Sequence, residues 1–205
     1  MSGDKIRVLL AEDQSMVREA LAALLGLEPD IEVVAQVARG DEVLAAARAH
    51  DVQVALLDIE MPGKTGIEAA AELHTALPAV HILILTTFGR PGYLRRAMES
   101  GAAAFLVKDA PAAQLAAAVR KVIAGERVID PTLAAAALAE GADPLTDRER
   151  DVLRAAADGA TNAELAAQLH LSPGTVRNYL STAIQKLAAR NRAEAVRIAR
   201  EKGWL

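Results

Sequence analysis

The spacing of apolar residues differs between the two halves of the chain. Over residues 6 to 124, short apolar runs alternate with longer amphipathic stretches, the pattern of repeated strand–helix units. The five expected strands are Ile6 to Ala11, Glu32 to Val37, Val52 to Leu57, His81 to Leu85 and Ala103 to Val107. Short apolar strands separated by helices predict an α/β fold, a doubly wound five-stranded parallel sheet with helices on both faces.

The pattern changes after Gly125. Residues 126 to 143 lack a strand signal and contain Pro131, an alanine tract and Gly141, so we interpret them as a linker that carries one helix. From Leu145 onward every segment has helical period. The expected helix signals are Thr146 with Glu149, Ser172 with Pro173, Asn191 with Glu194, and a stop at Lys202 and Gly203. The sequence thus predicts an α/β domain over 1–125, a linker over 126–143 and a small all-α domain over 144–205.

Composition and charge narrow the class of protein. Apolar residues make up 52% and aromatic residues 2%, so both cores must be built from Ala, Leu, Val and Ile. With no cysteine, no signal segment and no apolar run of about 18 residues, we expect a cytoplasmic protein without membrane insertion. The net charge of −4 hides a division, since residues 1–125 hold 12 Lys and Arg against 16 Asp and Glu, whereas residues 144–205 hold 10 against 7. Only residues 144–205, with their excess of positive charge, are suited to bind a polyanion.

Polar side chains gather where the expected strands end. These are Glu12 and Asp13 after the first strand, Asp58 after the third, Thr86 after the fourth and Lys108 after the fifth. Ligands of an open parallel sheet bind at this edge. Three carboxylates that meet there repel one another and need a cation, and Mg²⁺ accepts one or two carboxylates together with phosphate oxygens. Asp58 is then a candidate nucleophile toward a phosphoryl group, with Lys108 neutralising charge and the Thr86 hydroxyl donating to a phosphoryl oxygen.

Each of these residues alone has a simpler explanation. Carboxylates after strands often cap helices, and a lysine there is often solvated; the conjunction across four strands favours a site. Gly63-Lys64-Thr65 resembles the end of a nucleotide-binding phosphate loop, but that motif needs a glycine at position 58, where this chain has Asp. The four histidines, at 50, 74, 81 and 170, lack metal-ligand spacing and are expected at surface or boundary positions.

A helix-turn-helix is expected in the basic part of the chain. Apolar positions from Asn162 to Tyr179 fit two helices crossing over a tight turn, with Ala166 at the close approach and Leu171 filling the turn. The second helix, beginning at Ser172, would expose Thr175, Arg177, Asn178, Ser181 and Gln185. Arginine and asparagine match guanine and adenine edges in the major groove, and Lys186, Arg190 and Arg192 would contact phosphates. The alternative is a polar face that is merely solvated.

The motifs of the first half resemble a receiver domain of two-component signalling. They are Glu12-Asp13, Asp58 in LLDIEMPGKTG, Thr86 in ILILTTF and Lys108 in AFLVKDA, within residues 4–124. The resemblance implies a flavodoxin-like fold in which a sensor histidine kinase donates a phosphoryl group to Asp58, with Mg²⁺ held by Asp13 and Asp58 and with Glu12 assisting. It implies that Thr86 follows the phosphoryl group inward and that an aromatic residue swings in behind it. Here that residue is Phe105 rather than the commoner Tyr, and because Phe lacks the hydroxyl, a switch at this position must act through packing. The alternative is that Phe105 is an ordinary core residue.

Residues 144–205, with the motif LTDRERDVLRAAADGATNAELAAQLHLSPGTVRNYLSTAIQKLAARNRAEAV, closely resemble the LuxR/NarL type of DNA-binding domain. The resemblance implies base contacts from the positions of Arg177, Asn178 and Ser181, and dimer contacts through the last helix, Arg192 to Lys202. Asn178 and Ser181 stand where some members are apolar or basic, so the DNA sequence that is read stays open. GRPGY at 89–93 and the ending EKGWL are similar to a family member that controls a fatty-acid desaturase in response to membrane fluidity.

The expected function is that of a response regulator that binds promoter DNA and is not an enzyme, apart from self-phosphorylation at Asp58. RNA polymerase is a further candidate partner. We expect a homodimer on phosphorylation, because two helices carry more apolar residues than one core-facing stripe needs. These residues are Met16, Val17, Leu21, Leu24 and Leu25 on the first helix, and Leu115, Val119, Val122 and Ile123 on the fifth. The simpler explanation is the alanine-rich composition.

Two alternative functions differ in class. A stand-alone phosphoryl-transfer enzyme, such as a phosphatase, would leave the basic C-terminal part unexplained. A phosphorylation-independent scaffold would be expected to lack the acceptor or the lysine, and both are present. The kinase, the promoter, the direction of regulation and the lifetime of the phosphorylated state are left open by the sequence, as is activation by release of the DNA-binding domain.

Overall fold

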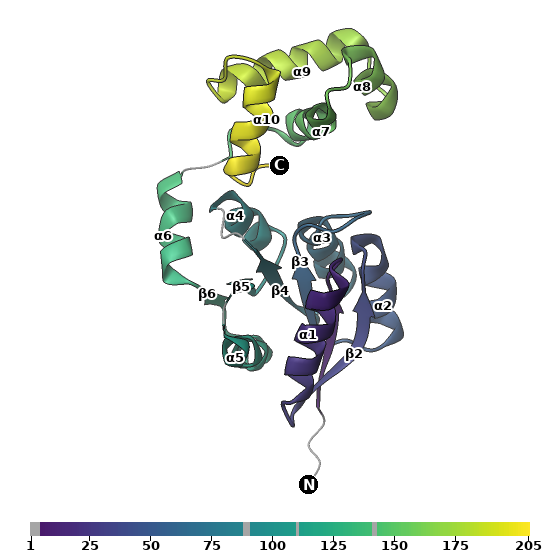
Figure 1. The fold of residues 1–205 in the computed structure, drawn as a ribbon, viewed down its shortest axis with the longest axis vertical. Helices are drawn as coiled ribbons and strands as arrows, with labels where there is room; N and C mark the ends of the chain where they lie inside the picture. The colour runs from purple at the N-terminus through teal and green to yellow at the C-terminus, as the bar shows by residue number, and fades with distance from the viewer. Residues whose placement is uncertain (1–4, 88–90, 110, 141–142) are drawn as a thin grey trace. The chain divides into compact units, whose positions relative to one another are not determined.

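The computed structural model describes residues 5–87, 91–109, 111–140 and 143–205, which divide into two compact units. The N-terminal unit is built on a parallel sheet (Figure 1) with strand order β2-β1-β3-β4-β5-β6. Its strands are β1 (Ile6–Ala11), β2 (Ile31–Val37), β3 (Val54–Asp58), β4 (His81–Thr86), β5 (Ala104–Val107) and β6 (Val128–Ile129). The order reverses between β1 and β3, and this reversal opens a crevice at the carboxyl ends of those strands.

The predicted parallel sheet is confirmed, with one strand more than expected. Four of the five predicted strands agree with the structure to within one residue, whereas β3 begins two residues later and includes Asp58 as its last residue. The sixth strand, β6, lies in the segment 126–143, where no strand was predicted. It has only two residues, paired as Ala104 with Val128 and Phe105 with Ile129, too few to show an alternating pattern.

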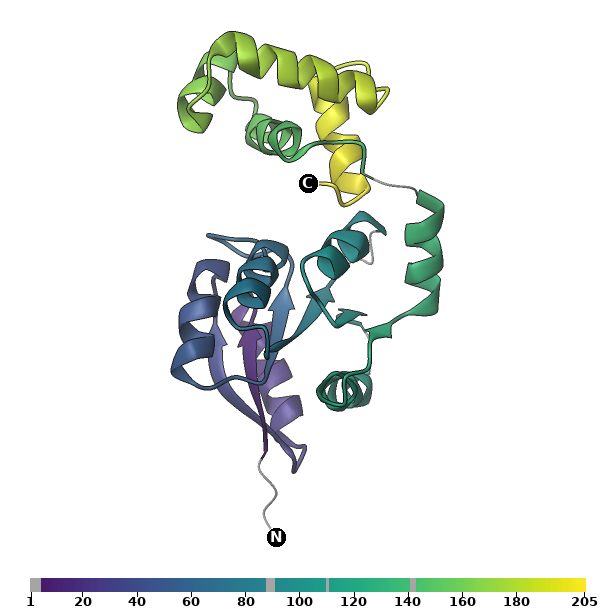
Figure 2. The ribbon, with the colours of Figure 1, turned by 180° about the vertical axis from the view of Figure 1, so that it is seen from behind.

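Helices cover both faces of the sheet. They are α1 (Ser15–Gly26), the 3₁₀ turn η1 (Gly40–Glu42), α2 (Val43–Ala49), α3 (Gly66–Ala76), α4 (Pro91–Glu99) and α5 (Ala112–Ile123). α1 and α5 pack on one face, where leucines of the strands meet Leu25 and Val119. α2 and α3 pack on the other face, which Figure 2 shows from behind. A doubly wound α/β layer structure therefore surrounds the crevice.

The C-terminal part is helical. After α6 (Pro131–Glu140) come α7 (Asp147–Ala155), η2 (Ala156–Asp158), α8 (Asn162–Leu169), α9 (Pro173–Lys186) and α10 (Arg192–Glu201). Leu153, Leu165, Val176 and Trp204 belong to its core. No helix in the described parts of the chain is both long enough and apolar enough to cross a bilayer.

The expected capping signals largely agree with the structure. Thr146 and Glu149 form a full capping box, and the Ser172 side chain caps α9 ahead of Pro173. Asn191 accepts the Glu194 N–H, but the Glu194 carboxylate turns to Arg190 instead of completing the box. Sequence reading missed two further boxes, Thr65 with Glu68 and Thr161 with Glu164, although both have the same S/T-x-x-E spacing.

Candidate phosphoryl site and DNA-binding surface

Three carboxylates meet at the crevice of the sheet. Glu12 and Asp13 follow β1, Asp58 ends the adjacent β3, and one carboxylate oxygen of each lies within 4.8 Å of the others. Glu12 is fully buried and Asp58 is 4% exposed, whereas Asp13 is exposed. The cluster is therefore closed on the side of the sheet and open to solvent at Asp13, where a hydrated ion or a phosphoryl donor has access.

Lys108 faces two of these carboxylates. Its Nζ lies 2.5 Å from Glu12 Oε2 and 3.0 Å from Asp58 Oδ1, and its side chain is 12% exposed. The Lys108 main-chain N–H donates to the Thr86 carbonyl oxygen at 2.8 Å, which fixes the ends of β5 and β4 together. Thr86 is buried. The structure thus brings Glu12, Asp13, Asp58 and Lys108 together, and the main chain of Thr86 adjoins them at the end of β4.

Burial dominates the electrostatics of the site. It raises the pKa of the Asp58 carboxyl to about 6; the Glu12 charge adds to this, while Lys108 and the Ile59 N–H oppose it. Burial disfavours the Lys108 ammonium, but its ion pair with Glu12 and the charge of Asp58 outweigh burial and raise its pKa. Three carboxylates with one ammonium leave an excess of negative charge. The donor set is all oxygen and suits a hard divalent cation such as Mg²⁺.

A residue that sequence reasoning missed supports the acidic loop. The guanidinium of Arg18, on α1, donates to the carbonyl oxygens of Glu12 at 2.5 Å and of Asp13 at 3.5 Å. The Gln14 N–H donates to Glu12 Oε1 at 3.3 Å. Nothing in the spacing of an arginine on a polar helix face indicates a main-chain partner, so the sequence contained no signal for this contact.

Phe105 is completely buried in β5. Its neighbour Leu106 belongs to the core under α1 and α5, so Phe105 points to the opposite face of the sheet. This packing agrees with an ordinary core residue, and the switch role stays a prediction. The four histidines are exposed or half-buried, as expected.

The predicted tight turn joins α8 to α9. His170 adopts a left-handed conformation with φ of 54°, and the Leu171 N–H donates to the Ala166 carbonyl oxygen at 2.9 Å. Ala166 is buried, and Leu171 packs on the core of the unit. The Ser172 Oγ accepts the Thr175 N–H at 3.0 Å and so fixes the start of α9. This geometry confirms the helix-turn-helix.

The outer face of α9 carries the predicted base-reading residues. Arg177, Asn178, Ser181 and Gln185 are exposed. Thr175 is half-buried, and its hydroxyl lies 2.8 Å from the Ser172 hydroxyl, so it takes part in the helix cap. An exposed arginine and asparagine one turn from a helix start suit entry into a major groove.

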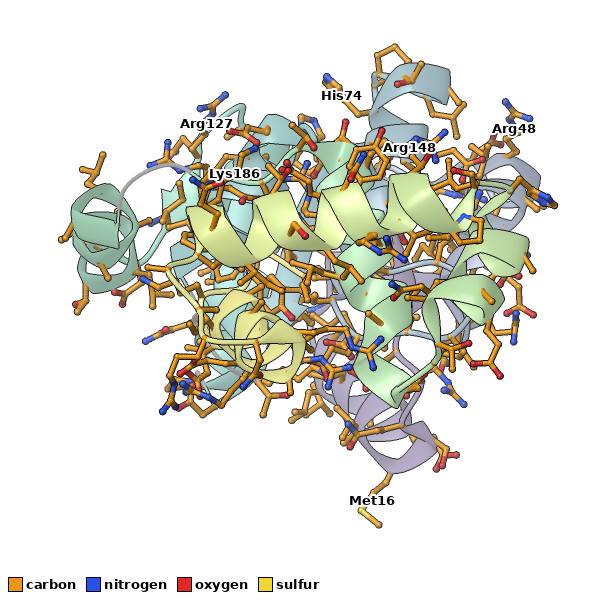
Figure 3. All side chains as sticks on the ribbon, turned by 90° about the horizontal axis from the view of Figure 1, so that it is seen from above. Met16, Arg48, His74, Arg127, Arg148 and Lys186 are labelled. Atoms are coloured by element: carbon orange, nitrogen blue, oxygen red, sulfur yellow. The ribbon has the colours of Figure 1, made fainter. Side chains whose placement is uncertain are left out.

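The predicted phosphate contacts have partners within the protein. Lys186, labelled on α9 in Figure 3, places its Nζ 2.7 Å from Oε2 of the buried Glu149 on α7. Burial works against the Glu149 carboxylate, but the hydrogen bonds from Lys186 and Thr146 prevail and lower its pKa. Arg190 binds Glu194, with its Nε 2.9 Å from Oε2 and an NH2 contact of 3.0 Å to Oε1. Lys186 therefore holds α9 on α7, a structural role that the sequence did not indicate.

The third residue that was predicted to contact phosphate also has a partner within the protein. Arg192, at the start of α10, donates to the carbonyl oxygen of Ala160 at 2.6 Å. Contacts of these cations to phosphate stay predictions, and Arg177 is the charged residue among the predicted base-reading residues and is exposed.

An acidic pocket at the switch point of a parallel sheet, followed in one chain by a helix-turn-helix, defines a signal-responsive DNA-binding protein. Residues 8–120 match the response regulator receiver domain, and residues 143–199 match the bacterial regulatory proteins of the luxR family. The chain belongs to the response regulators that combine a receiver domain with a LuxR-type DNA-binding domain, and its relatives are transcriptional regulators.

Several relatives match along nearly the whole chain. The transcriptional regulatory protein DesR of Bacillus subtilis is 46% identical, over 97% of this chain and 98% of its own. The uncharacterized transcriptional regulatory protein YvfU of the same organism is also 46% identical, over 98% and 100%. The crystal structure of ChrA, the response regulator of a heme-sensing two-component system, is 33% identical with a TM-score of 0.59, over 99% and 100%. Because two relatives match equally well, the finer resemblance to a desaturase regulator stays a prediction.

Proposed function

We propose that Asp58 accepts a phosphoryl group from a phosphohistidine of a sensor histidine kinase, and that this modification controls the binding of promoter DNA. The observation that supports the proposal is the convergence of Asp58 with two further carboxylates and the Lys108 ammonium at one edge of the sheet. Such a pocket offers an incoming phosphoryl group a nucleophile, a set of metal-binding carboxylate oxygens and a fixed cation. The protein would act in the cytoplasm, where promoter DNA lies.

The proposed chemistry is an in-line displacement at phosphorus. One Asp58 carboxylate oxygen attacks phosphorus and forms the acyl phosphate, while the bond from phosphorus to the imidazole nitrogen breaks and its electron pair stays on that nitrogen. Glu12, Asp13 and Asp58 would hold Mg²⁺, which supplies positive charge to the phosphoryl oxygens. The Lys108 ammonium offsets the charge on another oxygen. With acetyl phosphate the same residues carry out self-phosphorylation, and acetate leaves instead.

The response would begin at Thr86 and Lys108. A phosphoryl oxygen on Asp58 offers the Thr86 hydroxyl an acceptor and gives Lys108 an anionic partner in place of the Asp58 carboxylate. Movement of Thr86 then changes the packing around Phe105, which is the proposed switch. In the C-terminal unit, Arg177, Asn178 and Ser181 would read bases, and α10 would form contacts between two copies, with RNA polymerase as a further partner.

Incubation of the full chain with acetyl phosphate and Mg²⁺ tests the proposal. Intact mass should show the gain of one phosphoryl group, and a DNA site selected from a random-sequence pool should bind the modified protein more tightly. Continuous release of phosphate without stable modification would instead indicate a phosphoryl-transfer enzyme. An unmodified protein would indicate a scaffold.

The apolar residues on which the proposed dimer rests differ in their exposure. Leu25, Leu115, Val119 and Val122 are core residues, so the expected apolar surplus of α5 is reduced to Ile123, which is 36% exposed. On α1, Met16 is 82% exposed and Leu24 is 41% exposed, and Leu27 beyond its end is 79% exposed. Figure 3 shows Met16 projecting away from α1. The surplus is therefore concentrated on α1.

Met16→Glu is expected to weaken the phosphorylation-induced dimer by about tenfold or more, because a buried unpaired carboxylate opposes an apolar contact. Leu138→Glu is the matched control, since Leu138 on α6 is 80% exposed and apolar but lies outside α1. Sedimentation of both variants with and without acetyl phosphate measures the effect. If the modified wild type stays monomeric, the dimer is excluded, and release of the DNA-binding domain from an inhibitory contact becomes the better account.

A further inference from the structure

The loop that follows Asp58 is hydrogen-bonded to its carboxylate. This loop, residues 59–65, begins with Ile59, whose N–H donates to Asp58 Oδ1 at 2.8 Å. It ends against Gly66, whose N–H donates to the Ile59 carbonyl oxygen at 2.9 Å. A Cβ on Gly66 would lie 1.9 Å from the Asp58 carbonyl oxygen. Both ends of the loop therefore contact Asp58 or its neighbour.

The middle of this loop rests on the segment between β2 and α2. The Gly40 N–H donates to the Pro62 carbonyl oxygen at 3.1 Å. A Cβ on Gly40 would lie 2.0 Å from the carbonyl oxygen of Lys64. The two main chains are thus in direct contact, with no side chain between them, and the position of one fixes the position of the other.

A side chain completes this contact. Gly63 has φ of +81°, and a Cβ there would lie 2.4 Å from Asp41 Oδ1. Arg39 holds that carboxylate, with its Nε 3.0 Å from Oδ1 and its NH2 3.0 Å from Oδ2. The hydrogen bonds from Arg39 keep the pKa of Asp41 below its usual range, and the charge of Lys64 adds to this. The Asp41 carboxylate, which is 42% exposed, is thus held beside Gly63 by the Arg39 guanidinium.

We propose that Arg39 and Asp41 are positioning residues for the phosphoryl site. This inference rests on the proposed function and deepens it. Neither side chain touches Asp58; they act through Gly63 by holding the 59–65 loop, and through Ile59 they hold the acceptor carboxylate. Displacement of a reacting group by about 1 Å can slow a reaction by as much as 100-fold, so an outer support of this kind affects the rate.

Gly63→Ala and Gly125→Ala form a matched pair of variants. Their φ angles are +81° and +83°, so an alanine suffers similar backbone strain at both positions, but a Cβ at Gly125 would meet nothing within 4 Å. Both variants should lose thermal stability to a similar degree. Only Gly63→Ala should take up the phosphoryl group from acetyl phosphate more slowly, by about tenfold or more, and bind Mg²⁺ more weakly by calorimetry. Equal uptake rates and equal Mg²⁺ affinities in the pair would overturn the proposal.

Asp41→Ala is the second, independent variant. An exposed ion pair contributes little to stability, so its melting temperature should match that of the wild type. Its uptake of the phosphoryl group should nevertheless be several-fold slower, with weaker Mg²⁺ binding, because the loop has lost the carboxylate that lies beside Gly63. Wild-type values for both would contradict the inference.

The double variant Asp41→Gly with Gly63→Ala tests the contact itself. Removing the carboxylate leaves room for the alanine, so the double variant should be modified faster than Gly63→Ala alone, and additive losses would count against the contact. If the wild type takes up no phosphoryl group, the proposed function fails. The Mg²⁺ affinities of the same variants then still decide whether the loop is held from Asp41.

Discussion

Asp58→Asn is expected to abolish phosphoryl uptake from acetyl phosphate, whereas Lys108→Ala should retain uptake at a lower rate. The amide lacks the anionic oxygen that attacks phosphorus, while the lysine only offsets charge. Asp58 is the carboxylate that ends β3 and faces Lys108 at 3.0 Å. Labelled phosphate or intact mass measures the effect. Wild-type uptake by Asp58→Asn would show that the acceptor is another residue.

The unfolding free energy of Asp58→Asn is the control that shows whether this variant is folded. Burial raises the pKa of Asp58 from 3.8 to about 6, so the folded state binds this proton more tightly than the unfolded state. The ionised side chain therefore destabilises the metal-free protein increasingly between these two values, and fully above the higher one. At pH 7.5, about 1 to 3 kcal/mol of unfolding free energy should be gained by Asp58→Asn. Denaturant unfolding measures the gain, and Mg²⁺ should stabilise the wild type more than the variant.

The strand ends explain why the sequence predicted so much of the phosphoryl site. Parallel strands bring their carboxyl ends to one edge, so Asp58, Thr86 and Lys108 could be placed together from their position after apolar runs. Arg18 and Asp41 could not, because their partners are main-chain atoms and a glycine in other loops, and no periodicity encodes such contacts. The strand β6 was missed for the related reason that two residues define no period.

The DNA-binding surface shows the limit of reasoning from charge alone. Lys186 looks like a phosphate contact in a basic sequence, but it pairs with Glu149, which the sequence explains fully as a helix cap. A buried acid that caps one helix and holds another can be recognised only once α7 and α9 are packed together. Arg177 is exposed, as the position of the turn predicted.

Arg177→Ala is expected to lose about 1 to 3 kcal/mol of specific DNA binding and to relax the preference at one base position. Its unfolding should be unchanged, because the side chain is exposed. Lys186→Ala should behave differently, since it leaves the Glu149 carboxylate buried without its cation. It should lose about 1 to 3 kcal/mol of stability and weaken binding to specific and random duplexes alike. If Arg177→Ala weakens binding to specific and random duplexes equally, Arg177 contacts phosphate and does not read a base.

The double variant Glu149→Gln with Lys186→Ala separates the two roles of the lysine. The amide removes the unpaired charge, so stability should return toward that of the wild type. If Lys186 also binds phosphate, affinity for random duplexes should stay low, and the dependence of log affinity on log salt should be shallower by about one. If the lysine only supports the packing of α7 on α9, both affinity and salt dependence should recover with stability. Salt titrations of the single and double variants therefore decide whether one cation serves the fold, the DNA or both.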